Sequence, residues 1–204
     1  MLRLSANYNW QKCFYQLEYR MTFSWTPHRF SGGALALDVA NSVVLRAYPD
    51  RRIDRFADPA VMDAFAAGAN RHGGERVHFG GLEPVNDAER AGLVELREAI
   101  DRHFRAEALG TGTPGLLADL LDAIAATLRR SGRRPQALDT ATAHSALMLL
   151  ARAEPKRLKI CPNCEWLFLD RSRNRSRAWC DMAVCGNRAK ANRHYRRNRE
   201  ETQP

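Results

Sequence analysis

Two closely spaced cysteine pairs constrain this chain more than any other feature of its sequence. Two residues separate Cys161 from Cys164, fifteen residues follow before Cys180, and four more precede Cys185. Two thiol pairs around a hairpin-length spacer are typical of a four-thiolate zinc site, because Zn²⁺ favours tetrahedral sulfur ligands. We therefore predict one structural zinc ion per chain, bound by Cys161, Cys164, Cys180 and Cys185.

Other uses of these thiols are less well supported. Disulfides require an oxidising compartment, and residues 1–20 lack the apolar core of a secretory signal, so we expect a cytoplasmic protein. A catalytic zinc keeps one coordination position open, whereas four thiolates already complete a tetrahedron. His194 lies nine residues beyond Cys185, roughly 13 Å along a helix, and is not expected to bind. Redox-active thiols are the remaining alternative, and Cys13 is expected to lie outside the site.

The segment around the cysteines is strongly basic. Between residues 156 and 199, thirteen lysines and arginines stand against three acidic residues, a formal charge of +10. The whole chain carries +9, so everything else sums to −1. Zinc with four thiolates carries a charge of about −2, which leaves this segment with a net charge of about +8. Charge concentrated in this way indicates a polyanionic partner such as nucleic acid, with a merely solvated basic surface as the alternative.

The candidate nucleic-acid contacts form two groups of basic residues. The first group lies in the loop between the two thiol pairs and comprises Arg171, Arg173, Arg175 and Arg177. The second lies on a helix expected from about Cys185 to Arg199 and comprises Arg188, Lys190, Arg193, Arg196 and Arg197. Because the second group is spread almost all around that helix, the sequence indicates no single contact face.

Several short motifs surround the cysteines. They are Trp166-Leu167-Phe168-Leu169-Asp170, Ser172-Arg173-Asn174-Arg175-Ser176-Arg177, Trp179-Cys180-x-Met182 and Cys185-Gly186-Asn187-Arg188-Ala189-Lys190. Over about forty residues this stretch resembles the CGNR zinc finger. Proteins with that finger commonly carry an N-terminal ABATE domain and are described as stress-induced transcription regulators. The resemblance implies zinc binding, and it implies binding of DNA or RNA as an expectation.

The residues before the finger predict a helical domain over 21–154, preceded by an extension at 1–20 that fits the rest poorly. Apolar periodicity and helix-ending glycines indicate about five helices, near residues 34–44, 58–68, 86–110, 114–131 and 139–151. A short strand is expected at 76–79. Pro155 marks the domain boundary, because proline inside a helix removes a hydrogen bond. We expect a chain ending near Glu154 to remain folded.

The run Leu37-Asp38-x-x-Asn41-Ser42 is similar to the opening motif of the ABATE domain, although threonine is more usual at Ser42. Asp38 and Asn41 lie three residues apart, on one side of the first expected helix. They are candidates for a small polar site. We favour a structural role, in which both side chains bind backbone groups inside the helical core.

Alternating residues predict two short strands around the first thiol pair. The strand after it, residues 166–169, is apolar on both faces, so both faces are expected to be covered. We predict that one face packs on the zinc core and the other on the helical domain. The alternative is that Trp166 or Phe168 stacks on a nucleic-acid base.

The sequence thus predicts a mainly α protein. A helical ABATE-like domain at 21–154 precedes a small four-cysteine zinc module at 156–199, a short hairpin plus helix of treble-clef or zinc-ribbon type. We expect a non-catalytic zinc-finger regulator that binds DNA or RNA and no membrane, because no nucleophile–base motif or phosphate-binding glycine loop is present. The alternative is a protein-interaction module for an acidic partner. A homodimer and a small ligand of the helical domain stay open.

Overall fold

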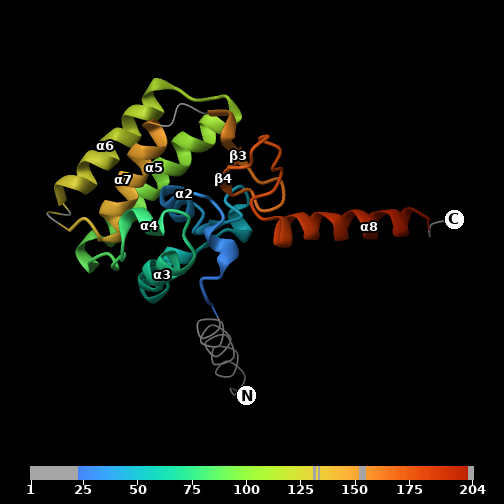
Figure 1. Ribbon diagram of the computed structural model, residues 1–204, viewed down its shortest axis with the longest axis horizontal. Coiled ribbons are helices and arrows are strands. Elements are labelled where there is room, and N and C mark those ends of the chain that lie inside the picture. Colours follow the sequence, from blue (N-terminus) through green and yellow to red (C-terminus); the bar gives the residue numbers. More distant parts are fainter. Residues whose placement is uncertain (1–22, 131, 133, 152–154, 202–204) are drawn as a thin grey trace, which may run out of the picture.

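A short buried helix, α2 (Leu35–Ala40), is the centre around which the helical part is built (Figure 1). The computed structural model describes residues 23–130, 132, 134–151 and 155–201; the extension at 1–20 with Cys13, and Glu154 at the expected boundary, fall outside these ranges. Helices α5 and α7 pack directly on α2. The other helices of this part are α3 (Pro59–His72), α4 (Arg76–Phe79), α5 (Arg90–Leu109), α6 (Pro114–Arg130) and α7 (Leu138–Ala151).

The first helix is shorter than its apolar pattern predicts, because its last residues belong to a strand. Val43 and Val44 form strand β1 (Val43–Val44), which pairs antiparallel with β2 (Ile53–Asp54). Valine branches at its β carbon and suits such a strand. The helix ends at Ala40, and the next residue, Asn41, uses its side chain to bind the zinc module instead.

Two further expectations in the helical part are corrected by the structure. Helix α3 continues through Gly68 to His72, because this glycine permits close packing rather than ending the helix. A Cβ there would lie 2.7 Å from the Phe30 ring and 2.8 Å from the Trp25 Cβ. Residues 76–79 form a helical turn and not a strand. That turn follows Glu75, whose carboxylate is buried and accepts hydrogen bonds from the Leu35 N–H and the Ser145 hydroxyl.

The zinc module begins with a hairpin of β3 (Leu158–Ile160) and β4 (Leu167–Leu169), paired antiparallel with Leu158 opposite Leu169. Leu167 and Leu169 face the hydrophobic core that α2, α5, α6 and α7 share, whereas Phe168 packs among the cysteines. This arrangement confirms the prediction that the two apolar faces are covered by different parts of the chain. Because Leu158, Leu167 and Leu169 complete the helical core, it argues against a chain ending near Glu154 remaining folded.

The Asn41 side chain connects the helical part to the hairpin through hydrogen bonds. Its side-chain amide donates to the Leu167 carbonyl and accepts from the Leu167 N–H, both at 2.9 Å. Asp38, also buried, accepts a hydrogen bond from the Gly32 N–H at 2.8 Å. Asn41 and one Asp38 oxygen therefore bind backbone groups, as the structural role expects, whereas the other Asp38 oxygen, Oδ2, is buried without a hydrogen-bond partner among the described residues.

The last helix, α8 (Asn187–Glu201), projects away from the rest of the molecule (Figure 1). A π-helical turn, η6 (Met182–Gly186), joins it to the zinc module, so the regular helix starts two residues later than expected. None of the helices in the described ranges combines the length and apolar character that crossing a membrane requires.

Candidate metal centre

The first thiol pair sits on a tight turn between β3 and β4. The Cys161 N–H donates to the Trp166 carbonyl at 2.9 Å, and the Glu165 N–H donates back to the Cys161 carbonyl at 2.8 Å. Glu165 takes a left-handed backbone conformation, with φ of 61°, to close this turn. The turn points both thiols at the same region, and the Cys161 thiol interacts with those of Cys164 and Cys180.

The second thiol pair is brought to the first by η6. Asp181 caps this turn, because its Oδ1 accepts hydrogen bonds from the Ala183 N–H at 2.8 Å and the Val184 N–H at 3.3 Å. The Cys180 Sγ then lies 3.5 Å from the Cys164 Sγ and 3.6 Å from the Cys185 Sγ. Cys161, Cys180 and Cys185 are buried, whereas Cys164 is partly exposed.

These distances fit a zinc ion. Four sulfurs bound tetrahedrally at about 2.3 Å from zinc lie about 3.8 Å apart, close to the 3.5 and 3.6 Å observed. Hydrogen bonds from Cys164 and Cys180 lower the pKa of the Cys161 thiol, while hydrogen bonds with Cys161 raise the pKa of the other two. Zn²⁺ binds thiolates, so metal binding would release the protons of these thiols.

His28 adds a donor that the sequence did not predict. Its Nε2 lies 3.8 Å from the Cys185 Sγ, and its Nδ1 lies 3.2 Å from the Asp181 Oδ2. The ligand atoms of His28, Cys164, Cys180 and Cys185 all lie within 4.8 Å of one another. Burial lowers the pKa of His28, against the raising effect of Asp181. No sequence motif marks His28, which is 157 positions from Cys185, so only the fold reveals its location.

The loop that follows β4 is organised by Asp170, whose role the sequence also did not show. The carboxylate is fully buried and accepts hydrogen bonds from the Lys159 ammonium at 2.7 Å, the Ser172 hydroxyl at 2.6 Å and the Arg177 N–H at 2.9 Å. Burial alone would raise the pKa of Asp170, but these hydrogen bonds outweigh it and hold that pKa well below its usual range.

Some of the predicted loop contacts are engaged within the protein. The Arg177 guanidinium donates to the Trp179 carbonyl at 2.9 Å and lies over the Phe168 ring, 5.0 Å from its centre. The Arg171 guanidinium donates to the Gly33 carbonyl. The side chains of Arg173 and Arg175 are exposed to solvent.

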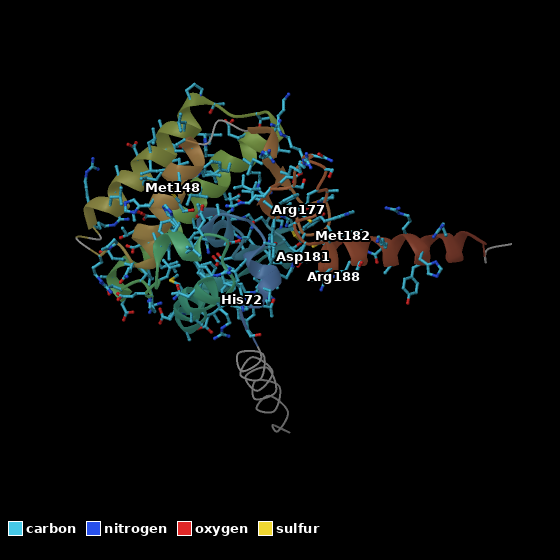
Figure 2. All side chains as sticks on the ribbon, in the orientation of Figure 1. His72, Met148, Arg177, Asp181, Met182 and Arg188 are labelled. Atoms are coloured by element: carbon cyan, nitrogen blue, oxygen red, sulfur yellow. The ribbon has the colours of Figure 1, made fainter. Side chains whose placement is uncertain are left out.

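The predicted nucleic-acid contacts on α8 that the structure describes, unlike Arg171 and Arg177 of the loop, have exposed side chains with no hydrogen bond to other described residues. The side chains of Arg188, Lys190, Arg193 and Arg197 are all exposed, and that of Arg196 lies outside the described part of the chain. Arg188 marks the base of the helix, near Asp181 and Met182, and Figure 2 shows the rest of α8 extending from there into solvent. Exposed basic side chains are therefore present on both the loop and the helix.

Comparison with protein-family models gives two matches. Residues 157–198 match the CGNR zinc finger, and residues 33–154 match the ABATE family, described as "putative stress-induced transcription regulator". The comparison with curated proteins finds no match. The two family matches confirm the resemblance seen in the sequence and, with the thiol cluster, establish one structural zinc site. His28 lies outside both matched ranges.

Proposed function

Because this chain belongs to the ABATE family and carries a CGNR zinc finger, we propose that it is a non-catalytic regulator that binds nucleic acid. The proposed zinc ligands are Cys161, Cys164, Cys180 and Cys185. The ion supplies folding energy on the order of 10 kcal/mol to a module with few apolar residues of its own. No reaction step is assigned to the helical domain: Asn41 and the Asp38 Oδ1 bind backbone groups, and no general base is identified beside the Asp38 Oδ2 among the described residues.

The observation that carries this proposal is the exposure of α8. Its fifteen residues span about 22 Å, and the major groove of B-DNA is about 12 Å wide, enough to admit an α-helix. Four described basic side chains of the helix are exposed, and the aromatic side chain of Tyr195 on the same helix is 71% exposed. Meanwhile Cys185 in η6 fixes the base of the helix to the metal site. We propose that α8 enters the major groove of duplex DNA.

Arg173 and Arg175 supply a second, smaller set of phosphate contacts in this proposal. Both are exposed on the loop beside the zinc site. Arg171 and Arg177 each donate a hydrogen bond to a backbone carbonyl within the protein. Phosphate contacts of this kind position a protein on nucleic acid, whereas contacts with base edges give sequence preference.

The test is a salt titration of binding to a mixed-sequence DNA duplex, followed by fluorescence anisotropy of the zinc-loaded protein. Replacing Lys190, Arg193 and Arg197 by Gln should reduce the log–log salt slope by about three, because each lost phosphate contact removes about 0.9. The matched control replaces Arg71, Arg102 and Arg129, which are exposed on the helical domain, and should leave the slope unchanged.

Three outcomes would contradict the proposal. Binding that does not depend on salt, or no binding to DNA or RNA, would assign the basic surface to an acidic protein partner. Tighter binding to single-stranded RNA than to the duplex would replace DNA by RNA as the ligand.

A further inference from the structure

The metal centre contains one donor more than a four-coordinate zinc ion uses. The His28 Nε2 and the thiols of Cys164, Cys180 and Cys185 lie within 4.8 Å of one another, and the Cys161 thiol interacts with those of Cys164 and Cys180. We propose that His28 is a metal-binding side chain of this centre, able to take the fourth coordination position beside Cys164, Cys180 and Cys185 in place of Cys161. This inference rests on the proposed zinc site and is independent of nucleic-acid binding.

The position of the imidazole suits coordination. A nitrogen at about 2.0 Å and a sulfur at about 2.3 Å from a tetrahedral zinc lie about 3.5 Å apart. The distance between the His28 Nε2 and the Cys185 Sγ is 3.8 Å, and the Cys164 and Cys180 sulfurs complete a group within 4.8 Å.

The orientation of the imidazole suits coordination as well. Histidines that bind zinc usually donate their other ring N–H to a carboxylate, which fixes the tautomer and directs the free lone pair at the metal. The His28 Nδ1 lies 3.2 Å from the Asp181 Oδ2, which leaves Nε2 directed at the thiols. The other oxygen of Asp181 caps the turn that carries Cys185. One carboxylate therefore aligns both donors.

The ring is also held in place from its sides. It stacks on Trp166, with ring centres 5.2 Å apart and planes inclined by 26°. His28 lies on the short helix η1 (Pro27–Phe30), whose last residue, Phe30, is buried in the helical core beside Phe65. A side chain held by an aromatic plane, a carboxylate and a buried anchor is preorganised for a ligand.

The experiment measures zinc retained by the full chain after dialysis against a chelator. Cys161→Ser should keep about one zinc, because His28 and three thiols remain. Adding His28→Gln to it should reduce zinc affinity at least tenfold, since only three donors are left. The matched control adds His144→Gln, an exposed histidine on α7, and should keep the metal. Cys185→Ser should lose zinc, because it removes a donor common to both ligand sets.

Cobalt substitution gives a readout of the ligand set itself. The cobalt form of Cys161→Ser should show weaker sulfur-to-cobalt charge transfer than the native chain and shifted d–d bands, as three thiolates and one imidazole require. Cys161→Ala serves as a second variant without a hydroxyl group.

Loss of zinc from both Cys161 variants as complete as from Cys185→Ser would overturn the proposal. Equal zinc retention with and without His28→Gln would also overturn it and leave His28 as a hydrogen-bonding neighbour of Cys185. If the native chain itself retained no zinc, the underlying zinc site would fail instead, which is a distinguishable result.

Discussion

The loop at 171–177 and helix α8 are both rich in arginine, yet part of the loop's charge is engaged within the protein, whereas the described charge of α8 is exposed. In the loop, the buried Asp170 carboxylate organises the backbone, and the Arg177 guanidinium lies over Phe168. On α8, the described basic side chains all face solvent. The difference shows that arginine density in a sequence does not measure availability to a partner. A nearby buried carboxylate or aromatic ring decides whether an arginine serves the fold or the surface.

The largest effect on the loop should come from Asp170→Ala. This change leaves the Lys159 ammonium and the Arg177 N–H without their common acceptor, and loss of one partner of a buried ion pair costs about 3 kcal/mol. Urea unfolding of the zinc-loaded protein measures it. The control is Asp87→Ala, because the Asp87 side chain is 92% exposed. Equal stability of the two variants would mean that Asp170 does not organise the loop.

The same carboxylate predicts a pH dependence. Although burial would raise the pKa of Asp170, the hydrogen bonds from Lys159, Ser172 and Arg177 lower it below the usual value of 3.8. Its stabilising effect is therefore present above pH 3.8 and is lost as the pH falls through the lowered pKa. The difference in unfolding free energy between the native chain and Asp170→Asn should narrow in that acidic range. A difference that stays constant down to the lowest accessible pH would contradict the assignment.

Replacing Arg177 should destabilise the protein more than replacing Arg173 of the same loop, although less than Asp170→Ala does. Arg177→Ala should destabilise the protein by about 1–2 kcal/mol, because it removes a hydrogen bond to Trp179 and the cover over Phe168. Arg173→Ala, at an exposed position, should change stability by less than about 0.5 kcal/mol. Thermal unfolding of both variants tests the contrast. Similar losses in the two would show that the loop arginines are equivalent after all.

The smallest effect on stability should come from removing most of α8. A chain ending at Lys190 should keep its zinc and lose less than about 0.5 kcal/mol of unfolding free energy, because the described side chains removed are all exposed. Its affinity for nucleic acid should nevertheless fall sharply. Zinc analysis and urea unfolding measure the first effect, and anisotropy measures the second. A large loss of stability would show that α8 packs against the body.

The sequence predicted what depends on local spacing and missed what depends on long-range placement. Three local patterns were informative: the cysteine pairs, the helical periodicity and the doubly apolar strand β4. They correctly indicated the mainly helical fold and the clustering of the cysteines. His28 reaches the metal centre only because η1 packs in the helical core. Gly68 was wrongly expected to end a helix. The Phe30 ring that occupies the space beside this glycine is distant in sequence, so the sequence did not show why a glycine is needed there.

The orientation of the projecting helix α8 depends on the π-helical turn η6 that precedes it. Its Cys185 belongs to the metal centre and Asp181 caps it, so an ion bound there would fix the direction in which α8 points. A rotation of about 10° at that turn would sweep the far end of a 22 Å arm through about 4 Å, comparable to the rise of one base pair. Loss of zinc should therefore change the direction of α8 before it changes the structure of the helical domain.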